Sequence, residues 1–367
     1  MKVLYDHQIF TSQIYGGISR YFVELMKNFE NDDTIEYDLS LRYSNNYYLK
    51  QINNISYKTF FKNYNFRGKG RFTNYINKKI SKKVICREHY DIFHPTYYDP
   101  YFLDFLNRKP FILTILDMIH EIFPEIFPLK DKTSERKKLL AQKATKIIAI
   151  SENTKRDIIK ILGIDEGKIE VIYLGNSLKI NKDVKTINIK IPEKYILFVG
   201  SRRGYKNFKL FIDAVSPLIN EDNELNIVCV GGGDFSMIEI EKFRSLKIRG
   251  KLFYYSGSDS ILACLYQKAI AFVFPSLYEG FGIPVLESFT CGCPVIVSNT
   301  SSLPEVAGEA AIYFDPTDKL SILNSIQKVI YNDKLRKQLI NKGIERVKEF
   351  TWEKTADKTK KIYEGVL

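Results

Sequence analysis

Two glutamates eight positions apart flank a glycine-rich turn in the last third of the chain. The apolar run 269–274 is short, β-branched and aromatic, which predicts a buried strand, and Pro284 favours the start of a helix that carries Glu287. The first-turn N–H groups and positive dipole end of such a helix form an anion site, and its backbone would come from Gly280, Phe281, Gly282 and Ile283. Glu279 and Glu287 would then reach hydroxyl groups on either side of a bound phosphate. A phosphate flanked by hydroxyl groups describes a sugar nucleotide.

At these residues the chain resembles the retaining family 4 glycosyltransferases of the GT-B fold, whose signature is a Glu-x7-Glu pair. The resemblance continues, in the usual order, through residues 292–296, 302–306 and 314–316. It implies that Glu279 contacts the transferred sugar and that Glu287 holds the ribose hydroxyls of the nucleotide. The plain alternative is a solvated turn residue and a helix-dipole partner, since two glutamates at this spacing are common by chance.

The resemblance also assigns a basic loop to the diphosphate. Residues 200–207 follow a strand-like run and match the loop that carries the family's basic pair. Arg202 and Lys206 take those positions, with Arg203 as the rival of Arg202. Two cations there would stabilise the charge that grows on the leaving diphosphate.

Further glycine turns border the expected site. Gly16 and Gly17 resemble the family's N-terminal glycine loop, and paired glycines permit positive φ and close backbone approach to a donor phosphate or the acceptor. Gly233 ends a turn that resembles the turn on the nucleotide side of the family's site. By the same resemblance, Ser256 lies in the segment whose backbone is expected to contact the base. The glycines before Asp234 lack the Gly-x-Gly-x-x-Gly spacing of dinucleotide sites, so NAD is not implied.

The sugar side of the site is expected in residues 114–121. The matching family segment usually reads His-Asp-Met-Ile-His-Glu, and Leu116 stands in place of its first histidine. We expect Asp117 or His120 to take over that role, with a helix N-cap as the structural alternative for Asp117. His94, at the end of another strand-like run, is a second-rank candidate on the acceptor side.

We expect neither a metal nor a cofactor. No Asp-x-Asp and no cluster with metal-ligand spacing occurs in the sequence. Arg202, Lys206 and helix amides would then meet the diphosphate charge. The resemblance further implies front-face attack, in which the departing phosphate oxygen accepts the acceptor's proton, so no protein general base is expected.

Short strand-like runs alternate with longer helical stretches along the chain, which predicts βαβ units, parallel sheets and an α/β fold. A chain of 367 residues is longer than a single hydrophobic core usually supports. The alternation of strands and helices stops in a polar stretch at 176–194, where we expect the linker between two domains. We predict two doubly wound, Rossmann-like domains facing a central cleft: an acceptor-binding domain at 1–178 and a nucleotide-sugar-binding domain at 179–349. By resemblance, a C-terminal helix at 350–367 returns to the N-terminal domain.

A basic, aromatic segment at 50–88 carries most of the net charge of +12. Its single acidic residue is Glu88, and its basic residues are Lys50, Lys58, Lys62, Arg67, Lys69, Arg71, Lys78, Lys79, Lys82, Lys83 and Arg87. This composition suits an anionic membrane surface and, less well here, nucleic acid. The plain alternative is a solvated helix whose aromatic rings face the core. With no leader and no spanning segment, we expect a cytoplasmic, peripheral membrane protein.

These observations predict a retaining hexosyltransferase of O-antigen, capsule or lipopolysaccharide biosynthesis. It would move a hexose, with mannose favoured, from a nucleoside diphosphate sugar such as GDP-mannose to a lipid-linked or growing glycan. The opening residues 6–10 support this by resemblance. One rival is a sugar-nucleotide 2-epimerase on the same fold, disfavoured because such enzymes lack the glutamate pair. The other is a non-enzymatic nucleic-acid-binding protein that uses the basic segment.

Overall fold

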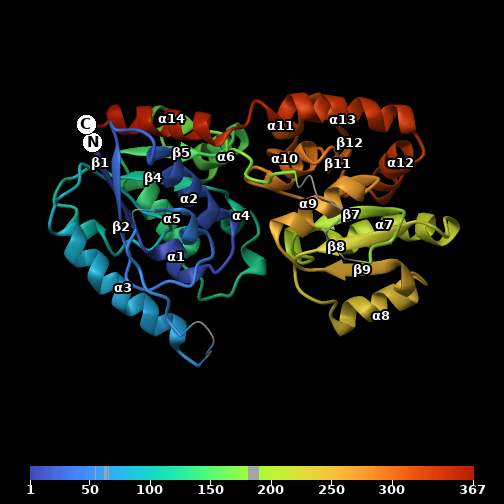
Figure 1. The fold of residues 1–367 in the computed structure, drawn as a ribbon, viewed down its shortest axis with the longest axis horizontal. Coiled ribbons are helices and arrows are strands. Elements are labelled where there is room, and N and C mark those ends of the chain that lie inside the picture. Colours follow the sequence, from blue (N-terminus) through green and yellow to red (C-terminus); the bar gives the residue numbers. More distant parts are fainter. Residues whose placement is uncertain (54, 62–63, 65, 181–189) are drawn as a thin grey trace. The chain divides into compact units, whose positions relative to one another are not determined.

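The computed structural model describes all residues except 54, 62–63, 65 and 181–189. The chain forms two compact units (Figure 1): unit 1 comprises Met1–Gly175 and Trp352–Leu367, and unit 2 comprises Asn176–Thr351. These limits lie a few residues from the domain boundaries expected at 178/179 and 349/350. Part of the expected linker, 181–189, lies outside the described residues.

Unit 1 contains two parallel three-stranded sheets. One has the order β2-β1-β3, with strands β1 (Lys2–Asp6), β2 (Glu36–Ser40) and β3 (Ile92–His94). The other has the order β4-β5-β6, with strands β4 (Ile112–Ile115), β5 (Lys146–Ala149) and β6 (Ile169–Val171). A bridge between Phe93 and Phe111 links the two sheets. The helices are α1 (Gln8–Ser12), α2 (Gly17–Phe29), α3 (Lys69–Ile85), α4 (Ile119–Ile122), α5 (Thr133–Lys143), α6 (Glu152–Asp157) and α14 (Trp352–Glu364).

The last helix completes the core of unit 1. Figure 1 shows α14, in red, lying on unit 1 with the first strands of the chain. The Tyr363 hydroxyl lies 2.9 Å from the Tyr5 hydroxyl of β1, and Thr355 donates a hydrogen bond to the Tyr173 carbonyl. Tyr363 and Tyr5 are both fully buried, so each ring adds roughly 1.5–3 kcal/mol of hydrophobic stabilisation. The return of the C-terminal helix to the N-terminal domain is therefore confirmed.

Unit 2 contains one parallel sheet in the order β12-β11-β10-β7-β8-β9. Its strands are β7 (Tyr195–Val199), β8 (Asn226–Val230), β9 (Leu252–Tyr255), β10 (Ala271–Phe274), β11 (Val295–Ser298) and β12 (Ala311–Phe314). Its helices are α7 (Phe208–Glu221), α8 (Met237–Ser245), α9 (Asp259–Lys268), α10 (Ile283–Thr290), α11 (Leu303–Ala307), α12 (Lys319–Ile330) and α13 (Asp333–Val347). These bounds confirm an α/β fold with parallel sheets.

The strand order places a switch point between β7 and β10. From β7 the chain runs outward through β8 and β9, then returns to add β10 on the other side of β7. Open α/β sheets bind ligands at such a reversal, beyond the carboxyl ends of the strands. The loops that follow β7 and β10 are therefore the natural place for a site in unit 2.

Among the residues that the structure describes, no helix is both long and apolar enough to cross a membrane.

Candidate active site

The loops that follow β7 and β10 meet at the switch point of unit 2. The Leu277 N–H donates to the Tyr205 carbonyl at 2.7 Å, which joins the two loops. The Lys206 Nζ lies 2.6 Å from the Glu279 Oε1, and the two side chains are only 14% and 11% exposed. The same ammonium lies 5.1 Å from the centroid of the Phe274 ring. Two residues predicted from separate motifs thus form one charge-assisted hydrogen bond that is largely shielded from solvent.

The glycine turn before α10 is fixed by the start of α11. Ser302 donates from its hydroxyl to the Glu279 carbonyl at 2.8 Å and to the Phe281 carbonyl at 2.9 Å. The Glu279 N–H donates to the Ser301 hydroxyl. Gly282 has a φ of +105°, and a Cβ there would lie 2.9 Å from a Leu303 methyl carbon. The turn therefore requires glycine, and it presents the positive end of α10 beside the ion pair.

Glu287 lies in α10, about one helical turn after the glycine turn. Its side chain is buried in α10, and the Tyr266 hydroxyl donates to its Oε2 at 3.3 Å. Burial, followed by the charge of Glu287, raises the pKa of Tyr266 well above its usual value. Tyr266 therefore stays a neutral donor that orients the carboxylate. Nothing in the sequence pattern marks Tyr266, because it lies in α9 at ordinary apolar spacing.

Arg202 makes contacts that its expected role did not include. Its side chain is 3% exposed, and its Nε donates to Glu239 at 2.7 Å. Its other nitrogens donate to three carbonyls of the next loop, those of Gly231, Gly233 and Asp234. The guanidinium therefore holds this loop in place, whereas its neighbour Arg203 is exposed. Diphosphate binding by either arginine stays a prediction.

The loop after β8 needs glycine at three consecutive positions, both for its backbone conformation and for its close approach to the loop after β7. Gly231, Gly232 and Gly233 all have positive φ. A Cβ on Gly231 would lie 3.1 Å from the Gly200 carbonyl oxygen, and one on Gly232 would lie 3.2 Å from an Arg202 nitrogen. Side chains would therefore push this loop away from the one after β7. Ser256, the expected contact to the base, is exposed just after β9.

In unit 1 the glycine loop differs from expectation. Neither Gly16 nor Gly17 lies in the left-handed φ region, since Gly16 is extended with a φ of 168° and Gly17 begins α2. A Cβ on Gly16 would instead meet the Gln13 side chain at 2.2 Å. That side chain accepts a hydrogen bond from the Ser19 N–H in the first turn of α2. The positive-φ explanation is thus wrong: Gly16 leaves room for a glutamine that caps the helix.

Asp117 and His120 lie at the start of α4, around a lysine that the sequence did not single out. Lys137 is fully buried, and its Nζ donates to Glu121 Oε2 at 2.8 Å and to the Asp117 carbonyl at 2.9 Å. The Asp117 carboxylate accepts from the Ile119 N–H in a local turn, but Met118 is the N-cap residue of α4, so Asp117 is not the helix N-cap expected as the alternative. Lys137 lies in a mostly polar helix, where nothing in the pattern marks it as buried.

The His120 ring stacks on Phe127, with ring centroids 3.8 Å apart. Burial, and then the charge of Lys137, lower the pKa of His120, so the imidazole is neutral near pH 7. Its Nδ1 and the second carboxylate oxygen of Glu121 have no hydrogen-bond partner among the described residues. The cluster therefore keeps an unused ring nitrogen and an unused carboxylate oxygen.

The acceptor-side assignment of His94 is wrong. The ring is fully buried, and its two nitrogens lie 2.6 Å from the Tyr363 hydroxyl and 2.9 Å from the Thr114 hydroxyl. Burial lowers the pKa of His94 to about 3. His94 thus belongs to the polar network that joins α14 to the sheets of unit 1.

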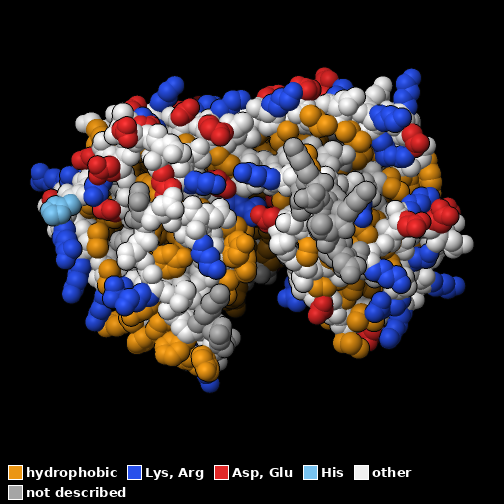
Figure 2. Space-filling view, in the orientation of Figure 1, with side chains coloured by type: hydrophobic (Ala, Val, Ile, Leu, Met, Phe, Trp, Pro, Cys, Tyr) orange, Lys and Arg blue, Asp and Glu red, His pale blue; other side chains and the backbone are white. Residues whose placement is uncertain are grey.

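The basic segment forms α3 and the chain before it. One face of α3 is buried and polar: Asn77 exchanges hydrogen bonds with the backbone of Tyr43, and the Ser81 hydroxyl lies 2.6 Å from those of Ser40 and Tyr101. Large rings project to solvent on other sides, namely Phe61, Tyr64, Phe66, Phe72 and Tyr75. Figure 2 shows hydrophobic side chains gathered at the lower end of unit 1, with Lys and Arg beside them. These five rings do not face the core, and Lys62 lies outside the described residues.

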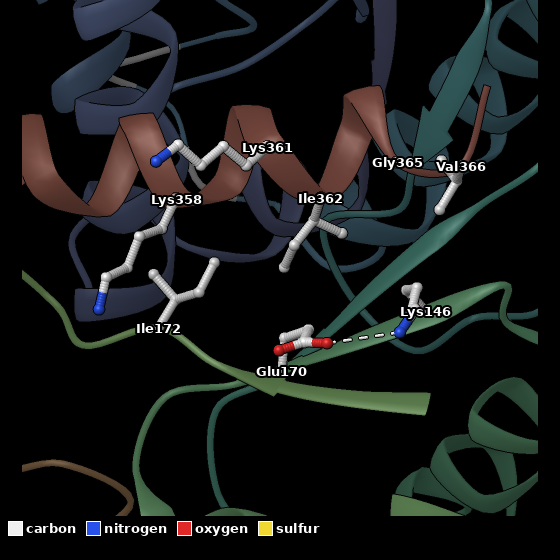
Figure 3. Close-up of a pocket in the computed structure, with 8 residues that line it drawn as sticks. All are labelled: Lys146, Glu170, Ile172, Lys358, Lys361, Ile362, Gly365 and Val366. Carbon is white, nitrogen blue, oxygen red and sulfur yellow. Dashed lines mark hydrogen bonds and ion pairs between the residues drawn. The ribbon is translucent and has the colours of Figure 1, made fainter. Parts of the chain in front are cut away.

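A separate groove of about 390 Å³ lies beneath α14 in unit 1 (Figure 3). Lys358, Lys361 and Ile362 reach it from α14, and Lys146 pairs with Glu170 across the neighbouring strands at 3.4 Å. It contains none of the predicted site residues. Within the described part of the chain, no group of three or more His, Cys, Asp or Glu side chains is placed to hold a metal ion.

Two family descriptions match consecutive parts of the chain. Residues 15–178 match the description Glycosyltransferase Family 4, and residues 179–346 match Glycosyl transferases group 1. Together they span the site residues of both units.

Individual proteins of known name are similar over much of the chain. O-antigen chain mannosyltransferase B of Escherichia coli is 27% identical over 375 residues, which cover 95% of each chain. O-antigen chain mannosyltransferase RfbU of Salmonella typhimurium is 31% identical over 250 residues, which cover 68% of this chain and 65% of the relative. The Anabaena protein HepE, solved with UDP and glucose, shares the fold with a TM-score of 0.75 at 18% identity, over the full length of both chains.

Proposed function

The chain belongs to the family 4 glycosyltransferases with the GT-B fold, and we propose that it transfers a hexose, with mannose favoured, from a nucleoside diphosphate sugar to a surface glycan with net retention. The observation that carries this proposal is the Lys206–Glu279 pair at the β7–β10 switch point, with Glu287 about one turn into α10. The names of the O-antigen relatives support mannose, and therefore GDP-mannose as the donor.

The geometry suggests how the donor would bind unit 2. The diphosphate takes the Lys206 ammonium and the positive end of α10, and a sugar hydroxyl replaces Lys206 as a hydrogen-bond donor to Glu279. Glu287, oriented by Tyr266, accepts from the ribose hydroxyls. In the absence of the donor, the ion pair keeps the Lys206 and Glu279 side chains in position. When the donor binds, each side chain exchanges its contact with the other for a contact with the donor.

Lys206 is expected to assist the reaction mainly by stabilising the negative charge that develops on the departing diphosphate. As the bond between the anomeric carbon and the phosphate oxygen breaks, negative charge grows on the diphosphate, and removing one such fixed cation costs roughly 2–4 kcal/mol of transition-state stabilisation. An acceptor hydroxyl forms the new bond to the anomeric carbon on the same face. Its proton passes to the departing phosphate oxygen, so no protein base takes part.

Positive charge from the protein serves here instead of a divalent cation. The positive charge comes from two places at the switch point. Lys206 and an arginine of the 202–203 pair lie in the loop after β7, and the N-terminus of α10 follows the loop after β10. We therefore expect donor cleavage to continue in EDTA. A complete loss of activity in EDTA that Mg²⁺ or Mn²⁺ restores would contradict this part of the proposal.

Unit 1 is proposed to bind the acceptor and to dock on the anionic inner face of the cytoplasmic membrane. The support is the exposed rings of the α3 region with the exposed cations Arg71, Lys79 and Lys83, each cation contributing about 1 kcal/mol near such a surface. Lys78 is less suited, because it pairs with Asp99 at 2.9 Å.

The docking proposal is tested with phosphatidylglycerol vesicles. Replacing Arg71, Lys79 and Lys83 by glutamine should abolish co-sedimentation and leave transfer to a short water-soluble acceptor intact. The matched control replaces three exposed cations of unit 2: Lys268, Lys334 and Lys337. Unchanged co-sedimentation of the α3 variant would reject the membrane surface.

The proposed reaction is tested by its product. The purified chain, GDP-mannose and a mannoside acceptor should yield GDP and a disaccharide whose new linkage is α, as the donor's is, when its anomeric proton is observed by NMR. A β linkage would contradict retention, and a product only with another sugar nucleotide would contradict mannose while keeping the reaction class.

A further inference from the structure

A groove of about 470 Å³ in unit 1 is lined by four tyrosines, of which Tyr64 alone is also one of the exposed rings proposed to face the membrane. Its rings are Tyr15, Tyr47, Tyr57 and Tyr64, two lysines lie on its walls, and the other lining residues are Ser, Asn, Thr and one Ile. The volume falls within the range of about 300–1,000 Å³ that is usual for small-molecule sites.

Two of these rings pack against each other although they are open to solvent. Tyr15 is 65% exposed and Tyr47 is 45% exposed, and their centroids lie 5.0 Å apart. The Tyr47 N–H donates to the Ile14 carbonyl, which ties their segments together. Asn46, itself buried, donates to the Gln13 carbonyl and accepts from the Tyr48 N–H. The backbone thus presents a fixed aromatic surface to solvent.

The lining favours a neutral polyhydroxylated ligand. A tyrosine offers a flat apolar face and a hydroxyl, which matches the C–H face and hydroxyl rim of a sugar ring. No lining residue that the structure describes carries a carboxylate. Of the two lysines, the Lys69 ammonium is bound to the Phe61 and Tyr64 carbonyls and the Lys50 ammonium lies 5.9 Å from the centroid of the Tyr47 ring. The phenylalanines of the α3 region lie outside the groove. Its chemistry therefore differs from that of the proposed membrane surface.

The position of the groove connects it to the acceptor. Tyr15 directly precedes Gly16 at the start of α2, in the connection that leaves the carboxyl end of β1. Substrates of open α/β sheets bind at this edge. A sugar chain whose end reaches the glycine loop would therefore pass over Tyr15.

We propose that the Tyr15–Tyr47 groove binds sugars of the acceptor glycan beyond the one that receives the new hexose. The identity of the ligand as an acceptor rests on the proposed function, whereas the binding of neutral oligosaccharide does not. The groove makes the enzyme prefer an acceptor that is already several sugars long.

Binding is tested without any donor. Neutral tetrasaccharides of mannose, glucose, galactose and N-acetylglucosamine are added to the full chain, and saturation-transfer NMR measures their contact with the protein. We expect at least one to bind wild type, roughly tenfold weaker binding in the double variant Tyr15→Ala/Tyr47→Ala, and retained binding in Tyr15→Phe/Tyr47→Phe, which keeps both rings. The control is Tyr75→Ala, an exposed tyrosine outside the groove.

The same variants separate this inference from the proposed function. With a tetrasaccharide acceptor, Tyr15→Ala/Tyr47→Ala should lower kcat/KM roughly tenfold, and with a monosaccharide acceptor it should match wild type. Equal tetrasaccharide binding by wild type and the alanine variant, or no binding of any of the four sugars, overturns the groove assignment. Failure of wild type to cleave any sugar nucleotide overturns the proposed function, and the NMR result still decides the groove.

Discussion

Removing either partner of the Lys206–Glu279 pair should change both the stability of unit 2 and its affinity for a nucleoside diphosphate. The two charged atoms are 2.6 Å apart and their side chains are mostly buried. At an effective dielectric constant of about 20, unit charges at this distance attract by roughly 6 kcal/mol, and desolvation offsets much of that energy. Loss of one partner from a buried pair costs about 3–5 kcal/mol. The residual exposure lowers our expectation to about 2–3 kcal/mol for Lys206→Met.

Glu279→Gln should act differently, because its amide oxygen still accepts a hydrogen bond from Lys206. We expect about 1 kcal/mol of lost stability. The variant also removes a negative charge beside the proposed diphosphate site, so the Lys206 ammonium no longer has an anionic partner there. GDP should therefore bind roughly three- to tenfold more tightly. Transfer should fall, because the sugar hydroxyl loses the carboxylate that accepts its hydrogen bond. Lys206→Met should weaken GDP binding instead.

Urea unfolding measures the first effect and calorimetric titration with GDP measures the second. The matched control is Lys348→Met, which removes the lysine of an exposed pair with Glu345 at the same kind of distance, 2.7 Å, and should cost less than about 0.5 kcal/mol. Equal losses of stability for Lys206→Met and Lys348→Met would refute the burial argument. Weaker GDP binding by Glu279→Gln would refute the exchange of the ion pair for donor contacts.

Three further outcomes are expected. Glu287→Gln should weaken GDP binding in calorimetry, because ribose contacts persist without the sugar; unchanged binding would remove Glu287 from the nucleotide site. Arg202→Ala should lose about 2–4 kcal/mol of unfolding free energy, because it leaves Glu239 and three carbonyls without their donor, whereas the exposed Arg203→Ala should lose less than about 0.5 kcal/mol; equal losses would contradict the structural role. The folded-state pKa of His94, about 3, lies below its unfolded value of about 6.5, so the unfolded chain binds the extra proton and stability should fall as pH drops from about 6.5 toward 3; a His94→Gln variant should show a flatter urea-unfolding profile over that range, and an identical slope would contradict the burial effect.

The sequence was sufficient for the strands of unit 2 and for its glutamate pair, because these signals are local. Buried parallel strands appear as continuous apolar runs, so β7 and β10 and the loops after them are evident from composition alone. Glu279 and Glu287 belong to one turn and the helix that follows it, so their spacing along the chain largely sets their spacing in space. The ion pair between two separately predicted loops followed from the order of the strands.

Long-range partners explain what the sequence did not show. His94 is buried by Tyr363, which lies 269 positions away, so its strand-end position was misleading. Lys137 and Tyr266 gain their roles only from the elements packed against them. The buried stripe of α3 is polar, through Asn77 and Ser81, while aromatic rings face solvent. Such a helix reverses the usual amphipathic pattern, and periodicity cannot assign its faces.

The Lys206–Glu279 site is proposed to cleave a sugar nucleotide, and release of nucleoside diphosphate from a panel of donors measures that cleavage. Wild-type chain, Glu279→Gln and Lys206→Met are incubated in EDTA with GDP-mannose and with UDP-, dTDP- and ADP-sugars, and the nucleotides are separated by chromatography. We predict release of GDP from GDP-mannose by wild type, with rates at least about 30-fold lower in both variants. No release from any donor, or equal release by wild type and both variants, would rule out donor cleavage at this site.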